Sequence, residues 1–252
     1  MTMKDIFYHF IKQADKPFHG WNFSFLADTG RLSTEPLPWS YAANVLHYIQ
    51  KIDSMLDMGT GGGEFLSLLT PLPARTAATE GYPPNVALAK AKLEPLGVSV
   101  YPVEDDTCLP FANNQFDLII NKHESYCELE IKRILKPNGI FITQQVGGLD
   151  NLELNHLLHA YNESEYSYWN MQYASSQLKQ AGFQILKQQE AFPYQRFYDI
   201  GSIVYYLKAV PWQIPDFSVS KYEDCLLCTY NSIQQDGYIE VKAHRFYIVA
   251  SL

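Results

Sequence analysis

The glycine-rich stretch of residues 54–71 places the strongest constraint on how this chain can fold. A short, largely apolar run ends at Leu56, and apolar residues recur at helical spacing after the glycines, up to a proline. Gly59, Gly61 and Gly63 can adopt positive φ angles and let a ligand approach the backbone closely. The stretch therefore predicts the end of a buried strand, a tight turn and the start of a helix. A glycine turn that binds nothing is the alternative.

The residues beside these glycines distinguish two nucleotide-type ligands. A dinucleotide fingerprint, Gly-x-Gly-x-x-Gly, needs a glycine at the position of Glu64, and it would bring an anionic pyrophosphate close to Glu64 and Asp57. Like charges at short range cost several kcal/mol or force a pKa shift. S-Adenosylmethionine carries a sulfonium and an ammonium group and no phosphate, so it suits these two acids better.

The rest of the chain alternates between strand and helix patterns. Besides the strand before the glycines, strands are expected at residues 75–80, 98–101, 116–121, 140–146, 183–192 and 238–250. Helices are expected at residues 40–50, directly after the glycines, and at 83–97, 128–135, 152–158, 169–180, 199–207 and 219–234. Such alternation predicts an α/β fold with a mostly parallel sheet and helices on both faces.

Composition and cysteine usage narrow the class of protein. A chain of 252 residues with a hydrophobic share of 47% fits one globular domain, and its net charge of −8 disfavours a nucleic-acid partner without excluding it. Cys225 and Cys228 form only half of a zinc site, and His156 and His159 have no evident carboxylate partner, so no metal is expected. No apolar run is long enough for a membrane span or a signal peptide, which makes the cytoplasm the expected location.

Four sequence segments in a fixed order resemble a known enzyme family. The segments LDMGTGGGEFL, ATEGYPPNVALA, LPFANNQFDLII and KRILKPNGIFITQQV resemble class I S-adenosylmethionine-dependent methyltransferases of the "methyltransferase type 11" group, which includes some ribosomal RNA guanine methyltransferases. The resemblance covers residues 50–150 well and the last strand less well. It implies a Rossmann-like sheet of seven strands, with residues 238–250 running antiparallel beside the fifth strand. It also implies methyl transfer (EC 2.1.1) from S-adenosyl-L-methionine, with S-adenosyl-L-homocysteine as the product.

The resemblance also implies which residues bind the cofactor. They lie in four segments: Asp57, Gly59, Thr60, Gly61 and Gly63 for the methionine part; Glu80, Gly81 and Tyr82 for the ribose; Asp105, Asp106 and Thr107 for the adenine; and Asn121 and Lys122 below the methionyl group. Glu80 has independent support, because it ends a predicted strand and lies 21 residues after Gly59, near the spacing of ribose-binding acids in Rossmann-like sites. The alternative for Glu80 is a solvated strand end.

The residues that would act on the methyl acceptor are less well defined. Because the sulfonium methyl is already activated, a base is needed only for an acceptor that carries a proton of high pKa. His123 and Glu124 follow the fourth strand and are the candidates, although His123 can equally be a hydrogen-bonded structural residue. The aromatic residues expected near the acceptor are Trp21, Trp39, Tyr126, Tyr198 and Trp212. A small-molecule acceptor is expected; an RNA methyltransferase and a non-catalytic S-adenosylmethionine-binding module are the alternatives.

The domain organisation follows from the same pattern. We expect one methyltransferase domain over residues 1–252, with the cofactor-binding core at 51–150. An N-terminal helical and aromatic segment at 1–50 and an insertion at 194–235 between the last two strands are expected to cap the acceptor site, because both are rich in amphipathic rings. Helical decoration with its own small core and a dimer contact are the alternatives, and the oligomeric state stays open.

Overall fold

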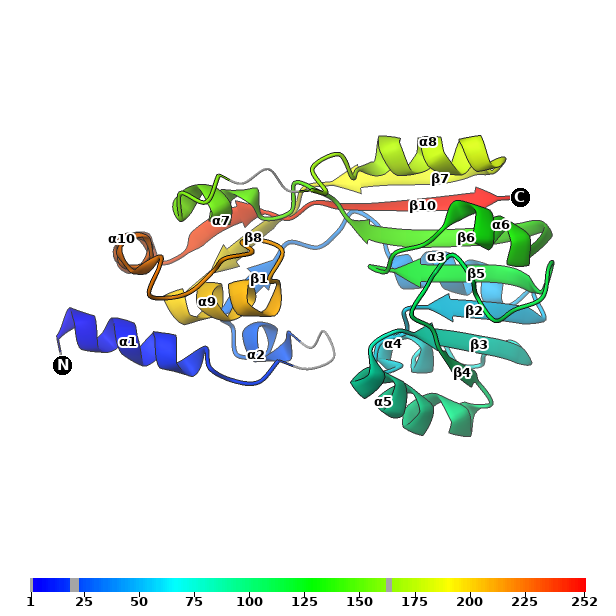
Figure 1. Cartoon of the computed structure of the whole chain (residues 1–252), viewed down its shortest axis with the longest axis horizontal. Helices are drawn as coiled ribbons and strands as arrows, with labels where there is room; N and C mark the ends of the chain where they lie inside the picture. The colour runs from blue at the N-terminus through cyan, green and yellow to red at the C-terminus, as the bar shows by residue number, and fades with distance from the viewer. Residues whose placement is uncertain (1, 19–22, 162–164) are drawn as a thin grey trace. The chain divides into compact units, whose positions relative to one another are not determined.

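The chain forms two compact units in the computed structural model (Figure 1), which describes residues 2–18, 23–161 and 165–252. The sheet unit consists of Pro38–Gly147, Trp169–Ala191 and Arg245–Leu252. The helical unit consists of Met1–Leu37, Gly148–Tyr168 and Phe192–His244. In the described part of the chain, no helix is both long enough and apolar enough to cross a membrane.

The sheet unit is built on a seven-stranded sheet with the strand order β4-β3-β2-β5-β6-β10-β7. Its strands are β2 (Ser54–Met58), β3 (Arg75–Glu80), β4 (Ser99–Pro102), β5 (Phe116–Lys122), β6 (Leu135–Val146), β7 (Gln184–Ala191) and β10 (Arg245–Ser251). The pairs β3–β4, β2–β3, β2–β5 and β5–β6 are parallel, whereas β10 runs antiparallel to both β6 and β7. The expected mostly parallel sheet with an antiparallel last strand beside the fifth is therefore confirmed.

Helices cover both faces of this sheet, as the alternation of patterns predicts. They are α3 (Tyr41–Ile49), α4 (Glu64–Ser67), α5 (Pro83–Leu93), α6 (Glu128–Ile134) and α8 (Met171–Ala181), with a 3₁₀ turn at Glu94–Leu96. Met55 packs with apolar residues of α3, α4 and α5, whereas its neighbour Leu56 packs with those of α6 and α8. Successive strand residues point to opposite faces, so a strand buried on both sides must be apolar throughout.

The helical unit has its own sheet and its own helices. Its helices are α1 (Met3–Gln13), α2 (Ser24–Ala27), α7 (Leu152–Leu157), α9 (Ile200–Ala209) and α10 (Glu223–Asp236). Its antiparallel sheet has the order β1-β8-β9, with strands at Leu32–Thr34, Tyr194–Phe197 and Ile239–Lys242. Strands β1 and β8 are too short for the sequence pattern to reveal them.

A separate hydrophobic core holds the helical unit together. Phe7, Val204 and Tyr230 are fully or almost fully buried in it, and they come from α1, α9 and α10. Helix α9 is apolar nearly all round, which is the pattern of a central helix. Its first turn is capped by Asp199, whose Oδ1 accepts a hydrogen bond from the Ser202 amide at 2.9 Å.

The last segment of the chain differs from the prediction. A single strand was expected at residues 238–250, but β9 and β10 are separate and belong to different sheets. Between them the His244 amide donates to Asp150 Oδ1 at 2.8 Å, and His244 Nδ1 accepts from the Leu149 amide at 3.2 Å. These contacts replace the strand ladder at that point, so the chain can pass from one sheet to the other.

The unit boundaries also differ from the expected segments. The N-terminal segment of the helical unit ends at Leu37, so α3 belongs to the sheet unit rather than to the expected segment 1–50. The C-terminal segment runs from Phe192 to His244 and is joined by Gly148–Tyr168, which the sequence pattern did not link with it. Contacts between distant segments define such units, and local periodicity does not report them.

Candidate functional site

The glycine turn after β2 has the backbone geometry that its sequence predicts. Gly59, Gly61 and Gly63 have φ angles of 64°, 63° and 82°, a region that residues with a side chain rarely adopt. The Thr60 amide donates to the Thr79 carbonyl at 2.9 Å, and the Gly63 amide donates to the Thr60 carbonyl at 3.0 Å. The turn is thus fastened to β3 and leads directly into α4.

Glu80 ends β3 with its carboxylate against this turn. Its side chain is buried, with Oε2 accepting from the Gly61 amide at 2.6 Å and Oε1 from the Tyr82 amide at 2.9 Å. Each carboxylate oxygen has a second lone pair that can accept a ligand hydroxyl. Glu80 therefore lies beside the glycines, as the ribose-binding prediction requires, and its predicted neighbour Tyr82 contributes through its backbone.

Asp57 lies at the end of β2 and is 3% exposed. Burial raises the pKa of Asp57 to about 7, although the Thr60 hydroxyl and the Lys122 ammonium group both favour the ionised form. The Lys122 ammonium group lies 5.1 Å from the centre of the Phe65 ring, and burial lowers the pKa of Lys122. An acid that is half protonated near pH 7 can still ionise when a ligand brings a positive charge to it.

Glu124 covers the first glycine of the turn. A Cβ atom on Gly59 would lie 2.5 Å from both Cγ and Oε2 of Glu124, far inside van der Waals contact. Burial and the negative charges of Asp106 and Glu80 raise the pKa of Glu124 to about 7. Asp106 is held in turn by the hydroxyl of Ser125, which donates to its Oδ2. Asp57, Glu80, Asp106 and Glu124 thus form an acidic site.

His123, the other proposed base, is committed to the fold. Its backbone has a φ of 62°, and its amide donates to the Gln144 carbonyl at 2.8 Å. Its Nε2 lies 3.2 Å from Nε2 of Gln144, which as an amide nitrogen can only donate, so the imidazole lone pair is already used. The protein atoms packed around the ring and the charges of Arg245 and Lys122 lower the pKa of His123. These contacts favour a structural role.

Asn121 also supports the loop that carries Glu124. Its buried Oδ1 accepts from the Thr143 hydroxyl at 2.8 Å and from Gln145 Nε2 at 2.6 Å, and its Nδ2 donates to the Ser125 carbonyl at 3.2 Å. The Tyr41 hydroxyl donates to the Asn121 carbonyl at 3.0 Å. Sequence reasoning missed the three supporting side chains of Thr143, Gln145 and Tyr41. The signal for two of them was a run of polar residues inside an otherwise apolar strand.

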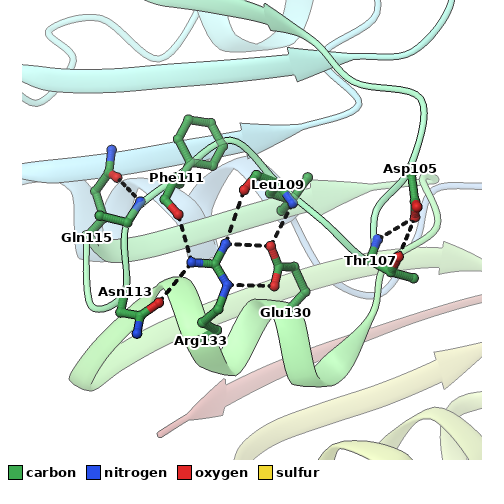
Figure 2. Close-up of polar contacts among 9 residues, drawn as sticks. Asp105, Thr107, Leu109, Phe111, Asn113, Gln115, Glu130 and Arg133 are labelled. Carbon is green, nitrogen blue, oxygen red and sulfur yellow. Dashed lines mark hydrogen bonds and ion pairs between the residues drawn. The ribbon is translucent and has the colours of Figure 1, made fainter.

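The predicted adenine segment lies in the loop between β4 and β5. Asp105 Oδ1 accepts from the Thr107 amide at 2.8 Å and from the Thr107 hydroxyl at 2.6 Å (Figure 2), and these two hydrogen bonds lower the pKa of the exposed Asp105. One carboxylate oxygen therefore shapes the loop while Asp105 stays ionised near neutral pH.

A pair of residues on α6 holds the rest of this loop (Figure 2). Glu130 Oε1 accepts from the Leu109 amide at 2.6 Å, and both carboxylate oxygens accept from the guanidinium group of Arg133. Arg133 also donates to the Phe111 carbonyl at 2.7 Å and to Asn113 Oδ1 at 2.9 Å. The sequence did not single out this pair, which resembles an ordinary helix-surface ion pair three residues apart.

The aromatic residues expected near the acceptor are divided between the two units. In the sheet unit, Trp39 donates from Nε1 to Gln144 Oε1 at 2.9 Å and packs 5.0 Å from the Tyr247 ring. It also lines a groove of about 520 Å³ beside α3, which does not include the glycine turn. Tyr198 and Trp212 belong to the helical unit and are 39% and 52% exposed. Trp21 lies outside the described residues.

Tyr126 follows Glu124 on the same loop and packs between two rings. Its ring centre lies 5.1 Å from that of Phe141 and 6.1 Å from that of Trp169. The buried hydroxyl has no hydrogen-bond partner within the described ranges, and burial raises the pKa of Tyr126. Across residues 2–18, 23–161 and 165–252, no three His, Cys, Asp or Glu side chains are arranged to hold a metal ion.

Comparisons with known proteins identify a related sequence family and related folds. Residues 56–143 match the sequence family described as "Methyltransferase domain". The fold is shared with a candidate methyltransferase of Bacillus halodurans, at 16% identity and a TM-score of 0.58, covering 84% of this chain and 99% of that one. A functionally unknown protein of Deinococcus radiodurans has a TM-score of 0.59 at 14% identity, with 87% and 90% of the two chains covered.

A third solved structure is a candidate sarcosine dimethylglycine methyltransferase of Galdieria sulphuraria. It has a TM-score of 0.52 at 16% identity, and the match covers 84% of this chain and 83% of that one. No curated protein matches the chain.

Residues 56–143 of the sheet unit therefore form a methyltransferase domain, and the sheet has the class I methyltransferase fold. The site fits the cofactor that this family implies. Glu124 and Leu93 lie within 2.7 Å of where a Cβ on Gly59 and on Gly63 would be, so only glycine fits at either position. The acids at the turn, Asp57, Glu80, Asp106 and Glu124, suit a ligand that carries a sulfonium and an ammonium group.

Proposed function

We propose that the sheet unit binds S-adenosylmethionine at the glycine turn and that the protein methylates a small molecule. One observation carries this proposal: the Glu80 carboxylate acts on both Asp57 and Glu124 at a turn whose glycines have positive φ angles. Such a site repels a pyrophosphate and attracts a cationic ligand. Family membership of residues 56–143 supports the choice of this cation.

Different residues of the turn would bind different parts of S-adenosylmethionine. Glu80 would accept hydrogen bonds from the ribose hydroxyls with the lone pairs that Gly61 and Tyr82 leave unused. Asp57 would ionise and balance the positive charge of the methionine part. The cofactor supplies an activated methyl group, and the protein's contribution is to hold the acceptor in line with it, which can supply several kcal/mol of the barrier.

The exposed rings of the helical unit and the net charge of the chain favour a small-molecule acceptor over a nucleic acid. Its exposed side chains include the rings of Tyr198, Trp212 and Tyr238, which suit the mostly apolar pockets that bind small molecules. The net charge of −8 is unfavourable for binding a polyphosphate backbone. We propose that this unit selects the acceptor.

Isothermal titration with S-adenosylmethionine and with NAD tests the cofactor assignment. We expect binding of S-adenosylmethionine and none of NAD, because the carboxylates disfavour a pyrophosphate. Glu80→Gln should weaken binding about tenfold, the effect of losing one charge-assisted hydrogen bond, whereas the exposed Glu94→Gln should leave the affinity unchanged. Binding of NAD alone would contradict the proposal.

A methyl-transfer screen tests the acceptor class. Purified protein is incubated with methyl-labelled S-adenosylmethionine and with either a metabolite extract or total RNA. Label in a small-molecule product supports the proposal, and label in RNA alone would replace it with RNA methylation. Absence of label from both fractions would favour a binding module without turnover.

A further inference from the structure

Glu124 occupies the space that Gly59 leaves open. Its Cβ, Cγ and Oε2 atoms all lie within 2.6 Å of the position that a Cβ on Gly59 would take. The loop behind it is rigidly held, because the Glu124 carbonyl accepts from Gln145 Nε2 at 2.9 Å and the same amide donates to Asn121. A ligand that approaches the backbone at Gly59 therefore meets the side chain of Glu124 first.

The charges around Glu124 differ from those around the neighbouring acids. Asp57 has the ammonium group of Lys122 among the charges that act on it, and Glu80 has two backbone amides. The charges that act most strongly on Glu124 are the carboxylates of Asp106 and Glu80, both repulsive, and only the amide and hydroxyl of Ser125 favour its ionised form. None of these three neighbours carries a positive charge, so a ligand cation would offset the repulsion at Glu124.

Resting on the proposed cofactor site, we propose that Glu124 selects the cofactor by the charge on its sulfur. The side chain moves off Gly59 when the cofactor binds, and its ionised carboxylate then faces the sulfonium. S-Adenosylmethionine is held by this charge, whereas S-adenosylhomocysteine, whose sulfur is neutral, is not. Glu124 is then a specificity-determining residue that favours the substrate form of the cofactor over the product form.

Loss of the methyl group would reverse the effect. Once the sulfur is neutral, Glu124 again faces Asp106 and Glu80 without a counter-ion, and its proton returns from solvent. The product complex is weakened at the moment when the product must leave. Glu124 would perform this role without taking a proton from the acceptor.

Titration calorimetry with three ligands at pH 6 and pH 8 tests the proposal. The ligands are S-adenosylmethionine, S-adenosylhomocysteine and sinefungin, which carries an amine in place of the methylated sulfur. In the wild-type protein, the affinity ratio of S-adenosylmethionine to S-adenosylhomocysteine should rise about tenfold from pH 6 to pH 8, because the ionised share of Glu124 rises by that factor. Sinefungin should behave like S-adenosylmethionine. Asp57 acts on parts of the cofactor that the ligands share. Its titration therefore changes their affinities alike and cancels in the ratio.

Glu124→Gln is the decisive variant, because it keeps the shape of the side chain and removes its charge. Its affinity ratio should be about tenfold lower at pH 8 and equal at the two pH values, and Glu124→Asp should restore part of the pH dependence. Glu94→Gln is the matched control, exposed in the same unit, and should behave like the wild-type protein. Circular dichroism verifies that each variant is folded.

Two results would overturn the proposal, and they differ from each other. An unchanged, pH-dependent ratio in Glu124→Gln would show that another group senses the sulfur charge while the cofactor site stands. Failure of the wild-type protein to bind any of the three ligands would remove the proposed cofactor site, and the role of Glu124 with it.

Discussion

At the scale of single residues, burial sets the chemistry of the glycine turn. Asp57 and Glu124 are taken out of water next to other acids, so each holds a proton to a higher pH than an exposed carboxyl group does. Such a site is costly for the folded protein when it is empty at alkaline pH. A cationic ligand offsets that cost, which couples cofactor binding to proton release.

The raised pKa of Asp57 predicts how stability depends on pH. The folded protein keeps a proton on Asp57 up to about pH 7, whereas the unfolded chain releases it near pH 4. Stability from this group is therefore present below pH 4 and is lost as the pH rises to 7. Asp57→Asn removes the titration. The free energy of unfolding of the variant, relative to that of the wild-type protein, should therefore be higher at pH 8 than at pH 5, by on the order of a few kcal/mol. Urea unfolding at the two pH values measures it; an equal difference at both would contradict it.

The close contact between Gly59 and Glu124 predicts a strong effect of Gly59→Ala. The new Cβ would need a backbone of φ 64° and would overlap Glu124, so we expect a loss of about 1–3 kcal/mol in stability. Gly97→Ala is the control, because Gly97 has a φ of 82° and open space around it, so it reports strain alone.

Removing the Glu124 side chain should rescue part of that loss. Urea unfolding of Gly59→Ala, Glu124→Ala and the double variant forms a double-mutant cycle. We expect the double variant to be more stable than the sum of the single effects. Additive effects on the free energy of unfolding would mean that the Glu124 side chain can move away from Gly59 without a loss of stability.

At the scale of elements, helix α6 determines the shape of the loop between β4 and β5. Glu130 and Arg133 lie one turn apart on the helix and together bind three points of the loop, at Leu109, Phe111 and Asn113. The loop carries the predicted adenine residues near its other end. Because Glu130 is only 6% exposed, its charge depends on the guanidinium group beside it.

Arg133→Met should therefore reduce the stability of the protein more than the loss of an exposed ion pair would. It leaves the Glu130 carboxylate buried without its partner, which costs about 3 kcal/mol, and it frees the loop. Arg133→Lys keeps the charge but loses the forked hydrogen bonds, so we expect an intermediate loss. Chemical unfolding and the affinity for S-adenosylmethionine are the measurements, with the exposed Lys51→Met as control. Wild-type stability in Arg133→Met would refute the role of this pair.

At the scale of the whole molecule, cofactor and acceptor functions are expected to reside in different units. The acids and glycines of the turn all lie in the sheet unit, whereas Tyr198 and Trp212 lie in the helical unit, which has a core of its own. Separate cores allow the acceptor preference to change without disturbing the cofactor site.

This division predicts the behaviour of Tyr198→Ala. The Tyr198 hydroxyl is hydrogen-bonded to the Ser33 hydroxyl at 2.9 Å on an exposed face, so the variant should fold. We expect methyl transfer to fall at least about tenfold in kcat/KM while the affinity for S-adenosylmethionine is unchanged, because only acceptor contacts are lost. Trp212→Ala should behave in the same way. If the affinity for S-adenosylmethionine fell as much as kcat/KM does, the proposed role of these rings in acceptor binding would be wrong.

The sequence by itself determined the backbone plan of the sheet unit. Strand and helix periodicity, turn residues and the glycines at 59, 61 and 63 are local signals, and each acts on a few neighbouring residues. The acids Asp57 and Glu80 were also predictable, because parallel strands bring their carboxyl ends to one edge of the sheet.

Tertiary structure alone decided which side chains meet. Glu124 lies on Gly59, Asn121 is held by Gln145, and His244 separates β9 from β10, each through partners far apart in the chain. Strand order and register create these contacts, and a periodic pattern specifies only which face a residue occupies, not its partner on that face. For that reason His123 and Asn121, which lie within three residues of Glu124 in the sequence, are tied into the fold while Glu124 faces the turn.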